Sequence, residues 1–308
     1  MTTHTRGVLE MSTAMIISGT IGWFVVHSGQ PVIDVVFWRC AIGAPALLAV
    51  CAALGLLRGR LTLRLLAFAA LGGMAIVLNW LLLFAAYPRA SIAIATAVYN
   101  TQPFMLVALG ALFLSEKLTA ARLGWLALAF AGMLLIIQAK PGAGAPGSDH
   151  LTGIALALGA AFFYALAALV AKKLAGTPPH LIALIQVCVG TLMLAPFVSV
   201  SSLETLPGDA RTWTILLTLG IVHTGLMYIL LYGAIQKLPT ALTGALSFIY
   251  PVVAIVVDML AFDHHLRPLQ LLGIAGILFA AAGMTLGWSW RSPWGSRARR
   301  WVTRSRHV

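Results

Sequence analysis

The sequence predicts an all-α membrane protein in which ten transmembrane helices form two inverted five-helix repeats around a central cavity. Three observations lead to this fold class. Of the 308 residues, 60% are hydrophobic and only 9% are charged, with a mean hydropathy of +0.96, so there are too few charges to cover a soluble surface. Two apolar segments are each interrupted once, before Pro103 and before Pro251. The residues around these two prolines follow the same outline at an offset of 148 positions.

Ten apolar segments are candidates for membrane spans, because about 20 apolar residues cross the hydrocarbon core as a helix. Helix-start residues such as Pro31, Thr119 and Pro179 precede or open several of them. The predicted spans are 8–27, 31–57, 65–87, 91–114, 120–138, 152–172, 179–200, 212–235, 240–262 and 268–289.

The chain divides near its middle, at a connection rich in Gly and Pro. We expect a first five-helix repeat in 1–138, a connecting loop in 139–150, a second five-helix repeat in 151–290 and a basic tail in 291–308. Laying 71–118 on 219–266 pairs residues of the same type: Gly72 with Gly220, Trp80 with Tyr228, Arg89 with Lys237 and Pro103 with Pro251. Five spans per half is an odd number, so the second half is inverted, as is common in alternating-access carriers.

Lys and Arg lie predominantly on one side of the predicted spans. With a cytoplasmic N-terminus, fifteen basic residues fall inside and four outside, and Arg39 is left within a span. Cytoplasmic loops carry the basic excess, so we expect a multi-pass protein of the plasma membrane, the inner membrane of a bacterium, with both termini in the cytoplasm. The six arginines after the last span are expected to meet anionic lipid head groups rather than nucleic acid.

Short motifs follow each proline. In the first half they are LSEKLT at 114–119 after Pro103, then Gly124 and Gly132, and in the second half Leu266, Gln270 and Gly273 after Pro251. Across nearly its whole length the chain resembles the drug/metabolite transporter superfamily, in its ten-helix EamA-type branch. The resemblance implies a helical basket with a central substrate cavity, secondary transport without ATP, and metabolite or drug export as the commonest task. The chain departs at His264, where the family usually has an acidic residue.

The polar interruption before Pro103 is a candidate cavity wall. Four hydrogen-bonding side chains at 99–102 precede a residue that cannot donate to the helix ladder. Such groups are costly against lipid and are tolerated facing a cavity. With aromatic and polar residues of other spans, the predicted cavity residues are Arg39, Asn79, Trp80, Tyr99, Asn100, Gln102, Tyr228, Ser247 and Tyr250, with helix breaks at Pro103 and Pro251. For Tyr232 we favour aromatic packing.

Arg39 is the strongest single candidate, because a charge within a span costs about 2.5–3.5 kcal/mol unless it is paired or hydrated. We expect it to hold an anionic group of the substrate, with Asp258 as its partner in the empty site; the alternative is a structural ion pair. For Asp258 the alternative is an interfacial position, which is also expected for Asp34. His223 is a second coupling candidate, or else a histidine hydrogen-bonded between helices.

The sequence indicates a carrier rather than an enzyme. It has no paired carboxylates at helical spacing, no nucleophile with a base nearby and no metal-ligand cluster, so no catalytic residue, metal or cofactor is expected. Cys40, Cys51 and Cys188 are expected to be small buried hydrophobes. We interpret the chain as a secondary transporter that exports a small organic metabolite or drug by alternating access, with a homodimer left open. The alternatives are a membrane-embedded enzyme and a passive channel.

Overall fold

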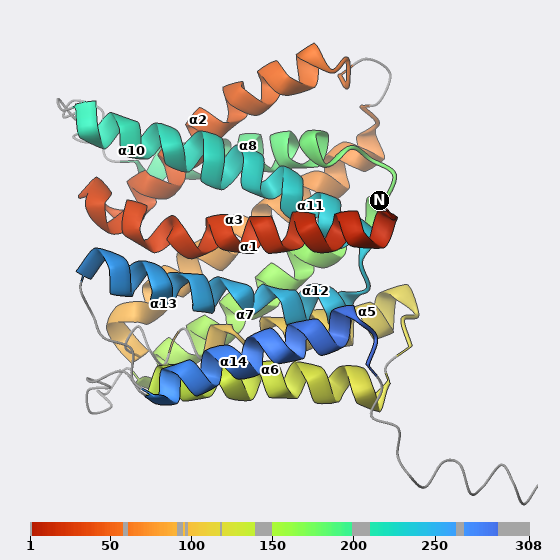
Figure 1. Cartoon of the computed structure of the whole chain (residues 1–308). Coiled ribbons are helices and arrows are strands. Elements are labelled where there is room, and N and C mark those ends of the chain that lie inside the picture. Colours follow the sequence, from red (N-terminus) through yellow and green to blue (C-terminus); the bar gives the residue numbers. More distant parts are fainter. Residues whose placement is uncertain are drawn as a thin grey trace, which may run out of the picture.

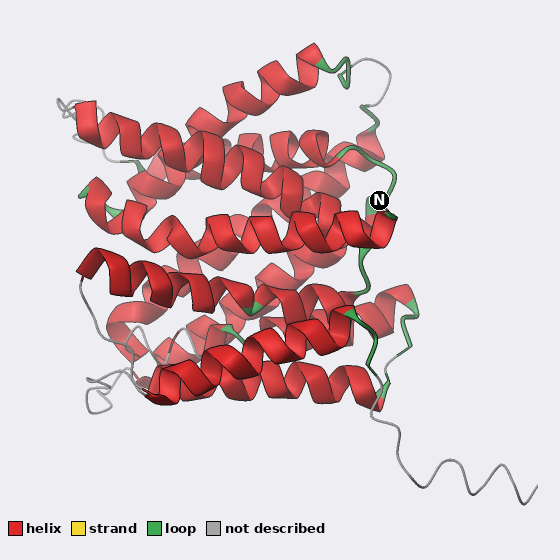
Figure 2. Cartoon of the chain, in the orientation of Figure 1, coloured by secondary structure: helices red, strands yellow, loops and turns green. Residues whose placement is uncertain are grey.

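The structure is a computed structural model that describes residues 2–57, 61–90, 95, 98–117, 119–138, 150–198, 210–262 and 268–288. All regular structure in these residues is helical (Figure 1, Figure 2). In chain order the helices are α1 (Thr3–Ser28), α2 (Val32–Ala53), α3 (Leu63–Ala90), α5 (Gln102–Leu114), α6 (Ala120–Gln138), α7 (His150–Lys173), α8 (Pro179–Leu194), the short η1 (Ala195–Phe197), α10 (Ala210–Gly220), η2 (Ile221–Leu226), α11 (Met227–Lys237), α12 (Thr240–Ser247), α13 (Ile249–Phe262) and α14 (Pro268–Thr285).

The described helices have the length and composition of a multi-pass membrane protein. Six stretches are long and apolar enough to cross a membrane: Thr3–Val25, Val32–Ala53, Leu63–Leu83, Leu151–Lys173, Pro179–Phe197 and Ala210–Lys237. Shorter apolar helices lie at Gln102–Leu114, Ala120–Leu135, Thr240–Ala254 and Leu271–Thr285. All of them coincide with predicted spans, while the count of ten spans stays a prediction.

Three predicted spans differ from the helices in detail. In the span 91–114, residues 91–94, 96 and 97 lie outside the described residues, and α5 begins at Gln102. The span 240–262 is divided at Phe248 into α12 and α13. Each proline lies in the first turn of the helix after the break, where its missing N–H leaves no helical bond unmade. The span 212–235 contains a π-helical turn, η2, that the sequence did not predict.

The main helix interfaces join one predicted repeat to the other. In Figure 1, α1 lies between α10 and α13, which are far from it in the sequence. α3 packs on α7 and α8, and in corresponding fashion α11 packs on α1 and α10 packs on α2. α5 packs on α7 as α13 packs on α1, while α2 meets α8, α5 meets α12 and α6 meets α14. When the halves are exchanged, α3–α7 corresponds to α1–α11, α3–α8 to α2–α10 and α5–α7 to α1–α13, while α2–α8 and α6–α14 each correspond to themselves.

Glycines allow two of these interfaces to be close. A Cβ at Gly220 would lie 2.6 Å from the Cβ of Ile42, where α10 crosses α2. A Cβ at Gly132 would lie 2.7 Å from the carbonyl oxygen of Gly273, where α6 crosses α14. Small residues commonly let membrane helices approach in this way, because packing replaces the hydrophobic effect between helices in lipid.

One burial prediction is wrong. Cys40 and Cys51 are buried as expected, but Cys188 is exposed. It lines an apolar groove of ≈ 660 Å³ between α2, the start of α3 and α8. The residues around Cys188 are apolar, as the sequence pattern predicts, but the other described helices do not cover its side chain. Asp34, expected near the membrane interface, is covered by protein at 1% exposure.

Candidate substrate site

Arg39 lies buried within α2, with 2% of its surface exposed. Its Nε donates to Thr224 Oγ1 at 3.2 Å, and its Nη2 to the carbonyl oxygen of His223 at 3.5 Å. Its Cζ lies 4.6 Å from the centroid of the Trp80 ring, a cation–π contact shielded from water. A guanidinium has five N–H groups, and these bonds to described residues use two of them.

The hydrogen-bond partners of Arg39 both belong to the π-helical turn η2. Such turns are rare in proteins overall, but they are frequent at functional sites. Here the Thr224 hydroxyl donates to the carbonyl oxygen of Leu219 at 2.8 Å, so its lone pairs face Arg39. Gly220, immediately before the turn, permits the close approach to α2 that places the turn beside Arg39.

His223 connects the same turn to α1. It is 2% exposed, its Nδ1 lies 3.3 Å from the carbonyl oxygen of Thr218, and its Nε2 lies 2.8 Å from Thr20 Oγ1. Because Nδ1 faces a carbonyl it carries hydrogen, so a neutral ring accepts the Thr20 proton at Nε2. A charged ring donates at both nitrogens, and the Thr20 hydroxyl then donates to the carbonyl oxygen of Ile17, 2.8 Å away. Both protonation states are fully hydrogen-bonded.

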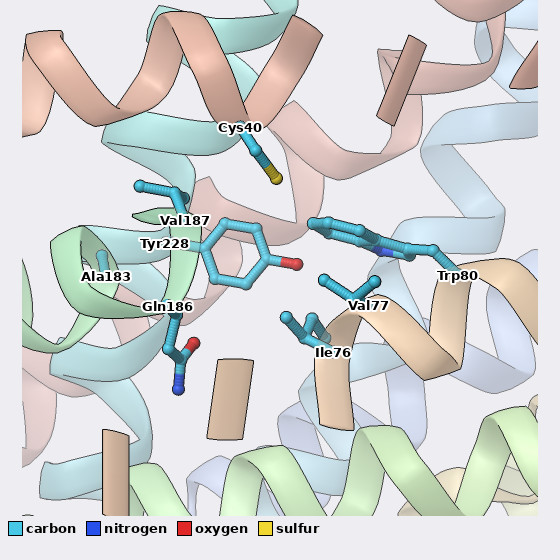
Figure 3. A pocket seen from close by; sticks show the side chains of 8 residues that line it. All are labelled: Cys40, Ile76, Val77, Trp80, Ala183, Gln186, Val187 and Tyr228. Carbon is cyan, nitrogen blue, oxygen red and sulfur yellow. The ribbon is translucent and has the colours of Figure 1, made fainter. Parts of the chain in front are cut away.

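Trp80 and Tyr228 border a small central cavity (Figure 3). Their rings are nearly perpendicular, with centroids 6.1 Å apart, and Figure 3 shows the Tyr228 hydroxyl directed toward Trp80. The cavity volume is ≈ 10 Å³, about enough for one water. A solute of several heavy atoms therefore enters only if the lining helices move. The lining residues are Cys40, Ile76, Val77, Trp80, Ala183, Gln186, Val187 and Tyr228.

Tyrosines continue this centre toward α7 and α12. The ring centroids of Tyr228 and Tyr232 are 5.3 Å apart, and the Tyr232 hydroxyl donates to Gln186 Oε1. The ring centroids of Tyr99 and Tyr164 are 6.3 Å apart. Five of the six tyrosines in the chain gather here: Tyr99, Tyr164, Tyr228, Tyr232 and Tyr250.

Polar side chains accompany these phenols. The Tyr99 hydroxyl faces Asn79, whose Nδ2 donates to the carbonyl oxygen of Ala160 at 2.8 Å. The Tyr164 hydroxyl faces Ser247. The centre thus combines one cation, several aromatic faces and separate hydroxyl groups, a set that can orient a small polar solute by its ends.

Comparison with known proteins then decides the class of protein. The model of the EamA-like transporter family matches residues 5–138 and 151–286. The chain belongs to the EamA-like transporter family. As a member of this family it is a multi-pass transporter of a small solute and not a membrane-embedded enzyme.

Individual relatives of this EamA-like transporter are also named as transporters or exporters. The chain is 32% identical over 290 residues to the uncharacterized transporter YxxF of Bacillus subtilis (strain 168), covering 91% of this chain and 89% of that protein. It is 33% identical over 171 residues to the threonine/homoserine exporter RhtA of Escherichia coli (strain K12), covering 53% and 54%. A solved crystal structure, 20% identical, superposes with a TM-score of 0.78 over 92% of this chain and 97% of that chain, which shows a shared fold.

In this EamA-like transporter, the residues predicted for the substrate site fall into separate groups. One group surrounds η2 and consists of Arg39, His223, Trp80 and Tyr228. A second group, Asn79 and Tyr99, belongs to the tyrosine cluster. Asn100 and Gln102 are buried, and Gln102 Oε1 has no hydrogen-bond partner among the described residues. The Asp258 side chain, His264, the loop 139–149 and the tail 291–308 lie outside what the structure describes, so the Arg39–Asp258 pair stays a prediction.

Sequence reasoning missed several contributors. Gln186 and Tyr164 are polar side chains within apolar spans, the same signal that singled out Asn79, and it could have found them. Thr224 and Thr20 carried no such signal, because a hydroxyl in a helix usually bonds the carbonyl of its own preceding turn. Only the packing of α1 and α2 against η2 gives them partners.

Proposed function

We propose that the protein exports a small organic solute bearing a carboxylate across the plasma membrane, and that Arg39 binds the carboxylate. The observation that carries this proposal is the buried guanidinium, which has N–H groups beyond the two that bond to η2 within the described part of the chain. Arginine binds carboxylates through two parallel N–H···O bonds, and such bonds are strong where water is excluded. The relative RhtA is named as an exporter of threonine and homoserine, and these solutes carry a carboxylate.

The transport mechanism that we propose is alternating access by two inverted repeats, 1–138 and 151–290, of five spans each. The paired interfaces of the two halves support it, since α3–α7 has its counterpart in α1–α11 and α5–α7 in α1–α13. The small central cavity also supports it, because a solute cannot pass without helix movement. We further propose that His223 carries the coupling proton, with the Thr20 hydroxyl accommodating both of its protonation states.

The orientation is proposed from the basic residues: both termini, and the tail 291–308 on its anionic lipids, lie in the cytoplasm. In a variant lacking the three native cysteines, single cysteines at Ser148 and Thr303 test it. An impermeant thiol reagent should label the first only from outside and the second only from inside. Labelling of both from the same side would contradict the inverted repeat.

Solute counterflow in proteoliposomes tests the role of Arg39. We expect saturable counterflow of an amino acid by the parent, and none of the corresponding amine that lacks a carboxylate. Arg39→Met should abolish counterflow, and Arg39→Lys should raise KM about tenfold or more, because a lysine cannot replace two parallel N–H bonds. Arg64→Met is the matched control, since Arg64 also lies over an aromatic ring, 5.9 Å from Phe68, but at the surface.

Two outcomes would count against the proposal. Parental KM in Arg39→Met would show that Arg39 is structural. Flux without saturation or counterflow in the parent would favour a passive channel.

A further inference from the structure

A second polar cluster lies outside the Arg39 site, where α11 passes into α12. Glu116 follows α5, and its Oε1 lies 2.8 Å from Nζ of Lys172 near the end of α7. Its Oε2 accepts hydrogen bonds from the N–H and the hydroxyl of Thr240, the first residue of α12, at 3.0 and 2.8 Å. Lys172 also donates to the carbonyl oxygen of Leu238. One ion pair thus binds both sides of the connection between α11 and α12.

A second ion pair holds the same connection from α1. Lys237, the last residue of α11, donates to Glu10 Oε2, and Arg6 binds the other oxygen of Glu10 at 2.9 Å. We name Glu10, Glu116, Lys172, Lys237 and Thr240 the 237–240 clamp. Figure 1 shows that α5 and α11 end, and α12 begins, on the side of the molecule where the N-terminus lies.

The backbone around Glu116 is shaped for this contact. Ser115 has φ 55°, the one positive φ of a non-glycine residue in the described residues. A serine in the left-handed region is strained and persists where the surroundings hold it. It directs the N–H of Glu116 back to the carbonyl oxygen of Gly110 at 3.3 Å. A Cβ at Gly110 would lie 2.7 Å from Thr240 Cγ2 and Oγ1, so glycine leaves room for Thr240 to reach Glu116.

The clamp is charged and mostly shielded from water. The side chains of Glu116 and Lys172 are 18% and 14% exposed. Burial by itself raises the pKa of the Glu116 carboxyl, but the bonds from Lys172 and Thr240 outweigh burial and leave that pKa below its usual value. Glu116 is therefore ionised at neutral pH, and its charge also suits the N-terminus of α12.

We propose that the 237–240 clamp closes the N-terminal side of the substrate site and opens when the site faces that side. Glu116 and Lys172 are positioning residues that hold α11 and α12 against α5 and α7. α11 carries Tyr228 and Tyr232, so the clamp determines where the lining of the site lies. Its ion pairs join the two predicted repeats, which must move relative to each other in alternating access. The inference rests on that part of the proposed function.

Side-specific thiol labelling tests the clamp. In a variant without native cysteines, Thr243→Cys places a thiol within α12. Thr243 suits the test because it is buried and its hydroxyl has no partner among the described residues. When Glu116→Gln is introduced into this Thr243→Cys variant, labelling of the thiol by an impermeant reagent should rise about tenfold or more, and only when the reagent is applied from the N-terminal side. Lys173→Gln is the matched control: Lys173 lies next to Lys172 but over the Phe113 ring, 5.2 Å away, and its loss should leave labelling unchanged.

The double variant distinguishes the clamp from a purely structural role, for which labelling would fall again as stability is recovered. Adding Lys172→Gln to Glu116→Gln should recover thermal stability, because no buried charge is stranded, while labelling stays high. Unchanged labelling in Glu116→Gln, or an equal rise from both sides, would overturn the inference. Ser247→Cys repeats the measurement if Thr243→Cys is poorly produced. The assay needs no solute, so the carboxylate proposal can fail without affecting it; equal labelling of the parent from both sides would instead reject alternating access.

Discussion

Replacing Gly220 by alanine tests the close crossing of α10 and α2 that brings η2 to Arg39. The new Cβ would lie 2.6 Å from Cβ and Cγ2 of Ile42 and 3.3 Å from the amide nitrogen of Gly43. Carbon atoms in contact are about 3.5–4.0 Å apart, and a Cβ cannot rotate away. The two helices must therefore separate by roughly 1 Å.

Moving α10 and α2 apart also changes the contacts of Arg39 in the candidate substrate site. It lengthens the 3.2 Å bond from Arg39 Nε to Thr224 beyond hydrogen-bond range. Overpacking costs about 1–3 kcal/mol, and the lost bond of a charged donor about 1.5–3 kcal/mol. We expect the free energy of unfolding to fall by roughly 2.5–6 kcal/mol in total, with a raised KM for the solute.

Reversible unfolding in detergent, followed by circular dichroism, measures the change. Gly124→Ala is the control, because no atom lies within 4 Å of a Cβ there, and it should be neutral or slightly stabilising. Equal stability of the two variants would refute the described crossing. If the Gly220→Ala variant loses stability but keeps the parental KM, the crossing of α10 and α2 stabilises the fold without affecting solute binding.

Three further predictions follow from individual contacts. Because the pKa of Glu116 is lowered in the folded protein, its contribution to stability is complete above the ordinary value of 4.5 and is lost as the pH falls through the lowered pKa; the stability difference between the parent and Glu116→Gln should shrink in acid, and a difference that grows there would contradict the ion pair. Thr20→Val should cost about 1 kcal/mol and flatten the pH profile of flux, whereas an unchanged profile would argue against His223 as proton carrier. Gly132→Ala should cost about 1–3 kcal/mol at the contact with Gly273 while solute KM stays parental, and a shifted KM would place that crossing in the transport path.

Helix positions could be predicted because lipid imposes a simple rule: apolar runs must be helical and polar interruptions must be covered. That rule located the break near Pro251, although the helix divides three residues earlier, at Phe248. It also singled out Arg39 as a buried cation. The partners of Arg39 could not be predicted, because they lie 184 and 185 residues away and depend on a π-helical turn that forms against α2.

The partnership of Glu10 with Lys237 has a consequence for synthesis in the cell. The two residues are 227 positions apart, and at about 5–20 residues per second a ribosome needs roughly 10–45 s to make the intervening chain. During that time α1 is already in the membrane without α11 and α13, which are its main neighbours in the finished protein. The first half would then have to be held by the insertion machinery until the second emerges, and loss of late helices should leave the early ones prone to degradation rather than folded as a smaller unit.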